Sequence, residues 1–235
     1  MEVDDRRTAE GDLGPAVAAG RDATIYAVGA DRVLRRTPDE RSLVAEAATM
    51  EHVRRAGYPV PRVHRVGPGE MELDRVEGPT MLDDLGKRPW RMHAHADTLA
   101  DLHHRLHAIA APDDLAAFPV AGGCVVHLDL HPGNVILSAA GPSVIDWTNA
   151  RRAPGEADVA LTWIILAAMD VDGSAPMRAL VSVFRRRFVK RFLAGAGRED
   201  ARRVLAAVGD HRAGDRNIRP SERMAIEALV VKEAL

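Results

Sequence analysis

The stretch HLDLHPGNVIL (127–137) sets polar side chains against short apolar runs, and VIDW (144–147) follows shortly afterwards. Asp129 and Asn134 belong to the first stretch, and Asp146 adds a carboxylate at the end of the second apolar run. Two interpretations compete. The residues form either a metal-hydrolase cluster of the His-x-Asp-x-His kind, or the catalytic loop and metal-binding carboxylate of a phosphotransferase.

The metal-hydrolase interpretation depends on an alternation of His127, Asp129 and His131. On a strand all three side chains would face one way, and neutral His and carboxylate are good zinc ligands. Pro132-Gly133 then bends the chain, and His211 is the only histidine further downstream, so a second ligand set is missing. This interpretation is the weaker one, and it predicts bound zinc in the purified protein.

The phosphotransferase interpretation uses every polar residue of the two stretches. Asp129 can accept the proton of an attacking hydroxyl. Asn134, five residues on, can return to the same site and offer its amide oxygen to Mg²⁺, and Asp146 can supply a carboxylate to the same kind of ion. Phosphoryl transfer needs mainly positioning, a base and metal-held charge neutralisation, and Mg²⁺ is often held by only one or two carboxylates beside phosphate oxygens. The alternative is a turn in which Asp129 and Asn134 merely satisfy backbone groups.

HLDLHPGNVIL followed by VIDWTNA resembles the catalytic and metal-binding segments of the aminoglycoside phosphotransferase/choline kinase-like family, which has a protein-kinase-like fold. The resemblance covers about residues 15–165. It implies that His127 supports the loop, that Asp129 is the catalytic base and that Asn134 and Asp146 bind the metal. It also implies ATP, with GTP as a possible substitute, Mg²⁺, and a small-molecule hydroxyl substrate such as an aminoglycoside-like antibiotic or a metabolite.

The pattern of apolar residues predicts a β-rich N-terminal lobe, a small antiparallel sheet with one helix, followed by a mainly helical C-terminal lobe. The resemblance implies that these form an α+β, two-lobed protein-kinase-like fold, in which residues 1–77 are the nucleotide-binding lobe and residues 78–235 the catalytic and substrate-binding lobe. Period-2 runs predict strands at 23–28, 32–36, 63–66 and 71–76 around a helix at 40–56. Helices are predicted at 80–85, 91–109, 158–168, 175–193, 199–208 and 220–234, with brief strands at 125–129, 135–137 and 143–146.

The helix at 40–56 tests the N-lobe independently. Glu46 falls within its apolar stripe, where a carboxylate is costly unless it is paired, and Arg35 is the nearest candidate partner. The alternative places Glu46 at the exposed edge of the stripe. The stripe consists of Leu43, Ala47, Met50 and Val53.

The nucleotide contacts are less specific in sequence. Gly20 and Thr24 are the candidates for a phosphate-covering loop, and by resemblance the adenine ring meets backbone groups near Asp74–Val76, so that Asp74 and Val76 mark the hinge. Arg35 stands where the family often has Lys; Arg stays charged, but the two residues are not interchangeable. This departure and the weak phosphate loop motivate an alternative, a catalytically weak kinase-like nucleotide-binding or scaffold protein.

The composition of the chain limits the classes of binding partner that we expect. A net charge of −2 gives no general attraction to nucleic acid or to a membrane surface, and the charged N-terminus lacks the apolar segment of a signal peptide. The single cysteine, Cys124, fits a reducing cytoplasm. We therefore expect a cytoplasmic monomer or homodimer that binds neither nucleic acid nor membranes.

The resemblance implies that the C-terminal helices build the acceptor pocket. Within FRRRFVKRF (184–192), three Phe residues at i, i+4 and i+8 predict an inward stripe with a solvated basic face. A pocket for a polycationic aminoglycoside should be acidic, and nothing in the sequence shows that the available carboxylates converge. They are Asp158, which we expect to be structural, Asp170, Asp172 and Glu199.

Overall fold

The computed structural model describes residues 1–4, 8, 13–19, 23–169, 174–214 and 218–234. The chain forms two compact units, one of residues 1–79 with 136–148 and the other of residues 80–135 with 149–235. The segment that carries Asp146 therefore belongs with the N-terminal residues, whereas the segment that carries Asp129 belongs with the helices. The functional division into lobes at residues 1–77 and 78–235 stays a prediction.

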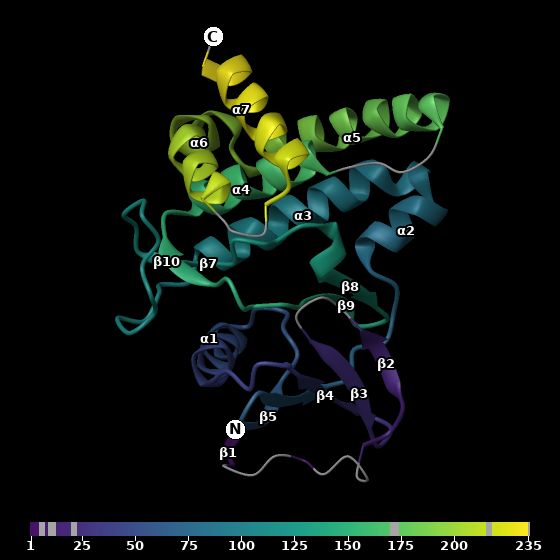
Figure 1. The fold of residues 1–235 in the computed structure, drawn as a ribbon, viewed down its shortest axis with the longest axis vertical. Coiled ribbons are helices and arrows are strands. Elements are labelled where there is room, and N and C mark those ends of the chain that lie inside the picture. Colours follow the sequence, from purple (N-terminus) through teal and green to yellow (C-terminus); the bar gives the residue numbers. More distant parts are fainter. Residues whose placement is uncertain (5–7, 9–12, 20–22, 170–173, 215–217, 235) are drawn as a thin grey trace. The chain divides into compact units, whose positions relative to one another are not determined.

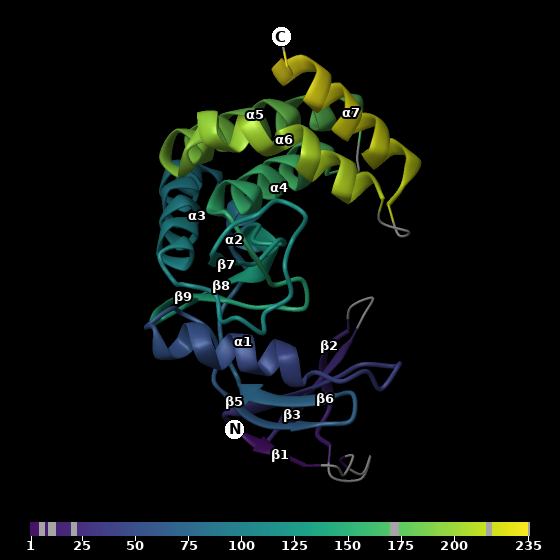
Figure 2. The ribbon, with the colours of Figure 1, turned by 90° about the vertical axis from the view of Figure 1, so that its left-hand side faces the viewer.

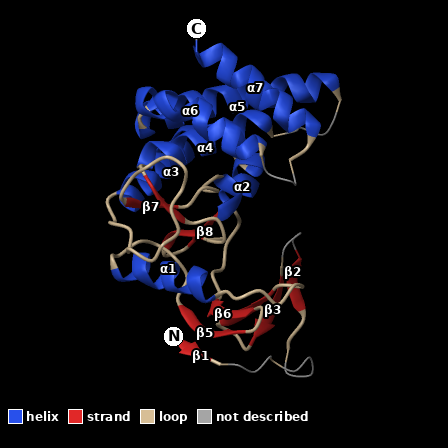
Figure 3. Cartoon of the chain, turned by 60° about the vertical axis from the view of Figure 1, so that its left-hand side comes forward, coloured by secondary structure: helices blue, strands red, loops and turns tan. Residues whose placement is uncertain are grey.

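The first unit is built on a six-stranded sheet (Figures 1 and 3). The predicted antiparallel sheet is confirmed for β2 to β6, and β1 adds a parallel pair with β5 at one edge, so that the complete sheet is mixed. In spatial order the strands are β1 (Glu2–Val3), β5 (Val63–Gly67), β6 (Glu70–Asp74), β4 (Arg32–Arg36), β3 (Thr24–Val28) and β2 (Ala16–Ala19).

Helix α1 (Val44–Arg55) packs against β5 through the predicted stripe. Leu43 and the three further members of that stripe are almost fully buried, which confirms the predicted orientation of the helix. The helix begins four residues later than expected, because Glu40 has a left-handed backbone (φ 51°) and Ser42 forms a bridge to Pro68.

A two-stranded sheet, β8 (Val135–Ser138) with β9 (Gly141–Val144), leads to Asp146. Leu137 N–H donates to Pro79 O at 2.9 Å, and Val144 N–H donates to Pro59 O at 2.8 Å. These two bonds fasten the segment to the N-terminal residues of the first unit, which fixes the backbone from which Asp146 projects.

The second unit is helical around α4 (Gly155–Ala168), most of whose side chains are buried. Helix α4 packs against α3, α5, α6 and α7, and Figure 2 shows these helices gathered around it. The other helices are α2 (Met81–Lys87), α3 (Met92–His107), α5 (Ala175–Ala196), α6 (Arg198–Ala213) and α7 (Pro220–Ala234). The unit also contains the small antiparallel sheet β7 (Cys124–Val126) with β10 (Arg151–Ala153), and 3-10 turns at Pro89–Arg91 and Pro132–Asn134.

Within the described parts of the chain, every helix is too short or too polar to traverse a lipid bilayer.

Candidate active site

The loop that carries Asp129 begins where β7 ends, at Val126. The predicted strand through Asp129 was therefore too long, and Leu128 has a left-handed backbone with φ 59°. That conformation breaks the alternation on which the metal-hydrolase interpretation relied. Among the described residues, no group of three or more His, Cys, Asp or Glu side chains is arranged to hold a metal ion.

Asp158, on the first turns of α4, holds the backbone of this loop. Its carboxylate is fully buried and accepts hydrogen bonds from His127 N–H (3.0 Å) and Leu128 N–H (2.8 Å), and it lies 3.1 Å from His107 Nε2. Burial opposes ionisation, but the hydrogen bond from His107 and the neighbouring imidazoles hold the pKa of Asp158 well below its ordinary value. An ionised carboxylate thus fixes two consecutive peptide groups, including the N–H of Leu128, the residue with the left-handed backbone.

Thr162, one helical turn further along α4, holds the next part of the loop. Its hydroxyl donates to Leu130 O at 2.9 Å and lies 3.1 Å from His103 Nε2. His103 is fully buried and donates from Nδ1 to Leu99 O, and burial lowers its pKa to about 4, so that it is a neutral packed residue.

Asn134 returns to Asp129, as the spacing predicted. Its Nδ2 donates both to Asp129 O (2.9 Å) and to Asp129 Oδ2 (3.0 Å). Because a backbone carbonyl only accepts, this pair of bonds defines which arm of the amide is nitrogen. The amide oxygen, the atom that a Mg²⁺ ion would use, lies on the opposite arm.

His131 borders the same carboxylate. Its Nδ1 accepts from Gly133 N–H at 3.0 Å, and its Nε2 lies 3.6 Å from Asp129 Oδ1. In the neutral ring the proton therefore sits on Nε2, on the side of Asp129. The Asp129 side chain keeps about a quarter of its surface exposed. It is consequently an oriented and accessible carboxylate, which is the form that a general base requires.

In the first unit, Arg35 makes the predicted pair with Glu46, at 2.5 Å between Nη1 and Oε1. The side chains are only 10% and 8% exposed, so Glu46 is inside rather than at the exposed edge of α1. Burial raises the pKa of Glu46, the charge of Arg35 opposes that rise, and the nearby charge of Asp146 adds to it. The net shift is upward, yet the ion pair is the feature that makes the buried carboxylate tolerable.

Arg35 also reaches the second acidic residue of this unit. Its Nη2 lies 3.6 Å from Asp146 Oδ1 and donates to Thr148 Oγ1 at 2.8 Å. The Thr148 hydroxyl lies 3.2 Å from Glu46 Oε2 and 3.1 Å from Asp146 Oδ1, so that its proton can bond either carboxylate. One guanidinium and one hydroxyl thus connect β4, α1 and the segment that follows β9.

Asp146 is the exposed member of this cluster, with 48% of its side chain accessible. Its backbone is left-handed (φ 64°), an uncommon conformation for a residue with a side chain. The next residue, Trp147, is buried, donates from its indole N–H to Val144 O at 3.1 Å and stacks edge-on against Tyr58. Trp147 therefore anchors the segment, and Asp146 remains open to a ligand.

Two of the remaining predicted nucleotide contacts, Thr24 and Asp74, lie on strands of the sheet. Thr24 is the first residue of β3 and pairs in register with Arg36, whereas Gly20 lies outside the described residues. Asp74 ends β6 and lies 2.6 Å from His64 Nε2, and the half-buried Val76 follows in an irregular segment. Their roles toward a nucleotide stay predictions.

Sequence reasoning missed Thr148 and Thr162. Each is a threonine that bridges groups distant in the chain: Thr148 connects with Glu46, and Thr162 connects with Leu130. Threonine next to an acidic residue or inside an apolar helix is common. The only local signal was the i, i+4 spacing of Asp158 and Thr162 on one face of α4.

The sequence profile of the Phosphotransferase enzyme family, abbreviated APH, matches residues 72–208, more than half of the chain. The chain therefore belongs to this phosphotransferase family, as the motifs predicted. Among curated proteins, no sequence matches the chain significantly.

Several aminoglycoside phosphotransferases are among the solved structures of similar fold. APH(4)-Ia is 16% identical with a TM-score of 0.66, and the match covers 95% of this chain and 94% of that one. ADP-bound APH(2'')-Ib is 14% identical with a TM-score of 0.59, covering 93% and 91%. APH(2'')-IIa in a ternary complex with streptomycin and ATP is 14% identical with a TM-score of 0.58, covering 85% and 83%. These likenesses establish the kinase-like fold.

Proposed function

We propose that the protein transfers the γ-phosphate of ATP to a hydroxyl group of a small molecule. The observation that carries this proposal is the arrangement of Asp129 and Asn134: an accessible carboxylate, oriented by an amide, on a loop whose backbone is held by a buried aspartate. Family membership supports the reaction class. The nucleotide-bound structures of similar fold support ATP as donor, with GTP as a possible substitute, because one of them is a GDP complex.

In the proposed reaction, the acceptor hydroxyl oxygen forms a bond to the γ-phosphorus. The bond from that phosphorus to the β–γ bridging oxygen breaks, and ADP leaves with the electron pair. Asp129 accepts the proton of the hydroxyl, and His127 belongs to the backbone segment that sets the position of this loop. The buried support of the loop keeps the carboxylate in place before the substrate arrives, which lowers the entropic cost of the step.

The residues present fit a magnesium ion by the chemistry of their donors. Mg²⁺ prefers oxygen ligands, and Asn134 and Asp146 each carry one: an amide oxygen pointing away from Asp129 and a half-exposed carboxylate. When bound, the ion would neutralise charge on the nucleotide phosphates. Arg35, fixed by Glu46, is proposed to orient the phosphates. Gly20 and Thr24 are proposed to cover them, and the backbone from Asp74 to Val76 is proposed to contact the base.

The scaffold alternative is not favoured. It was motivated by Arg35 in place of Lys, yet Arg35 makes the buried pair with Glu46 that this position requires.

The test compares wild type with Asp129→Asn. The asparagine keeps the size of the side chain and an oxygen for the Asn134 bond, but it cannot take up a proton. We expect turnover of Mg²⁺-ATP to fall by about a hundredfold or more, as loss of a general base implies, with nucleotide binding retained. Asp101→Asn, at an exposed position on α3, is the control. Full turnover in Asp129→Asn would remove Asp129 from the role of base.

A further inference from the structure

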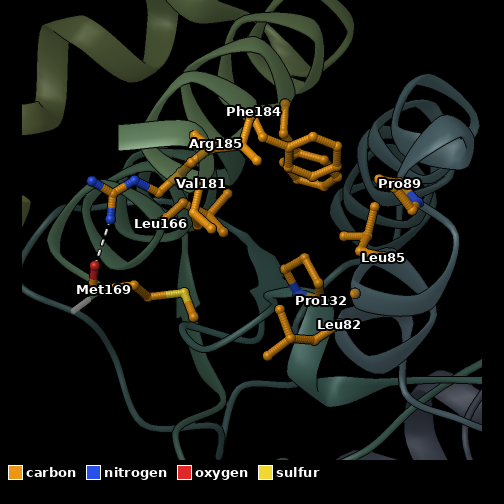
Figure 4. Close-up of a pocket in the computed structure, with 12 residues that line it drawn as sticks. Leu82, Leu85, Pro89, Pro132, Leu166, Met169, Val181, Phe184 and Arg185 are labelled. Carbon is orange, nitrogen blue, oxygen red and sulfur yellow. Dashed lines mark hydrogen bonds between the residues drawn. The ribbon is translucent and has the colours of Figure 1, made fainter. Parts of the chain in front are cut away.

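The second unit contains a cavity of about 480 Å³ between α2, the 3-10 turn at Pro132–Asn134, the end of α4 and α5 (Figure 4). This volume lies within the range of about 300–1,000 Å³ typical of small-molecule sites. Its walls are aliphatic and aromatic, and Arg185 is the one charged residue among the described residues that line it. The side chains that shape it include Leu82, Leu85, Pro132, Leu166, Phe184 and Phe188.

One wall of this apolar pocket is the loop that carries the proposed base. Pro132 borders the cavity beside Leu82 (Figure 4). It lies three residues after Asp129, in the same turn as Asn134. A Cβ built on Gly133 would lie 3.9 Å from Leu82 Cδ2, which shows how closely α2 approaches this turn. A molecule in the pocket would therefore lie against the catalytic loop.

The opposite wall belongs to α5, and Arg185 is the cation of this helix that lines the pocket. The sequence of α5 has six cations and no carboxylate, and Arg185 at the pocket donates to Met169 O at 2.5 Å (Figure 4). Phe184 and Phe188 line the cavity, while Phe192 is in the core, so the predicted inward Phe stripe contributes directly to the pocket. A positively charged ligand would meet apolar surface and like charge here.

The acidic residues with a described position among those that could have served a polycation, Asp158 and Glu199, do not line this pocket. Asp158 is buried and bonded to the loop backbone, and Glu199 is exposed on α6 beside Arg202. Asp170 and Asp172 lie outside the described residues. Asp158 and Glu199 are thus committed elsewhere, and the pocket has no acidic lining residue within the described chain.

From these observations we infer that the acceptor is a hydroxylated molecule with an apolar body and no positive charge, and that its body occupies the apolar pocket. This inference rests on the proposed function, because it names the class of acceptor for the same catalytic loop. It separates this protein's acceptor from the polycationic antibiotics streptomycin and gentamicin, which are bound in structures of similar fold.

The test uses linear alcohols from butan-1-ol to decan-1-ol as probes, with binding measured by calorimetry in the absence of nucleotide. Each added methylene buried in the pocket should tighten binding about fourfold, until the chain fills the cavity. Octan-1-ol should bind more tightly than 8-aminooctan-1-ol, which has a similar body but carries a cation. Equal or tighter binding of the amino alcohol, or no dependence on chain length, would overturn the inference.

A matched pair of variants tests whether the alcohols bind in the apolar pocket. Leu180 lines the pocket and is 66% exposed, so Leu180→Glu should fold and should weaken octan-1-ol binding at least tenfold. Val183, on the same helix and 46% exposed, does not line the pocket, and Val183→Glu should bind as wild type does. Equal binding by the two variants would overturn the inference. So would a wild-type dimer that Leu180→Glu dissociates in sedimentation, since a second copy would then cover this face.

Transfer of labelled phosphate from Mg²⁺-ATP tests the apolar acceptor and the proposed phosphotransferase function separately. Transfer to octan-1-ol but not to gentamicin is the expected result. Transfer to gentamicin alone would overturn the apolar acceptor and leave the phosphotransferase function standing. Pocket-dependent binding of alcohols without phosphate transfer to any acceptor would instead overturn the proposed function and, with it, the acceptor role of the pocket.

Discussion

Replacing Asp158 by Asn tests how the catalytic loop is held. The carboxylate accepts from two backbone N–H groups and from His107, whereas an amide has only one accepting arm. In the best orientation its NH₂ group still faces the N–H of Leu128, a buried donor. An unsatisfied buried donor costs about 1–3 kcal/mol, and the remaining bonds lose their charge assistance, so we expect a loss of about 2–4 kcal/mol in the free energy of unfolding.

The same substitution should release the loop. Leu128 keeps its left-handed backbone (φ 59°) only while its N–H is bonded, and such a conformation stores about 1–3 kcal/mol. We expect faster hydrogen exchange at the amides of His127 and Leu128, together with reduced turnover of ATP.

The pH dependence gives an independent signature. Because the folded pKa of Asp158 is depressed, its contribution to stability is complete above the unfolded value of about 3.9 and is lost as pH falls through the folded pKa. The difference in free energy of unfolding between wild type and Asp158→Asn should therefore be constant from about pH 7 to 5, and it should shrink below about pH 4.

Urea unfolding, followed by tryptophan fluorescence, measures these differences. Asp101→Asn is the control: the Asp101 side chain is 65% exposed and pairs with Arg105 at 3.8 Å, so it should cost less than about 1 kcal/mol. If Asp158→Asn were no less stable than Asp101→Asn and kept its loop amides protected from exchange, the role given to Asp158 would be refuted.

Two further substitutions probe the first unit. Arg35→Met leaves the buried carboxylate of Glu46 without a cation and should lower the free energy of unfolding in urea by about 3–5 kcal/mol. Arg35→Lys should lower it by less, and equal losses in the two variants would contradict a specific ion pair. Gly78→Ala should lower the melting temperature sharply, because Gly78 has a φ of 149° and the new Cβ would lie 2.1 Å from a backbone carbonyl oxygen. The control is Gly86→Ala, which has open space and a helical backbone and should be neutral or stabilising. Similar melting temperatures for the two variants would show that the close approach at Gly78 is not maintained.

Several elements of the fold could be predicted because their residues carry a local signal. The strands β3 and β4 have β-type residues around a glycine turn, and the buried face of α1 follows from its apolar period. The strands β1, β2 and β10 were missed. Their sequences, EV, AVAA and RRA, have no strand signature, and they are extended only because a neighbouring strand offers an edge to pair with.

The candidate site likewise contains residues that the sequence predicts and residues that it does not. Glu46 was found because a carboxylate in an apolar stripe demands a partner, and Asn134 because five residues allow a return to Asp129. Thr162 was not found, since its partner Leu130 lies 32 residues away and only the packing of α4 beneath the loop brings them together. Such contacts depend on the tertiary structure and leave no local pattern.

The most direct measurement is a thermal-shift titration with ATP, with and without Mg²⁺, on wild type, Asp146→Asn and Asp39→Asn. Asp39 is the control because its side chain is 54% exposed, close to the 48% of Asp146. A ligand at a hundred times its dissociation constant should add about 2.7 kcal/mol of stability. A Mg²⁺-dependent rise in wild type and Asp39→Asn that is lost in Asp146→Asn is the predicted result. No rise with millimolar ATP, or an equal rise in Asp146→Asn, would contradict a metal–nucleotide site at Asp146.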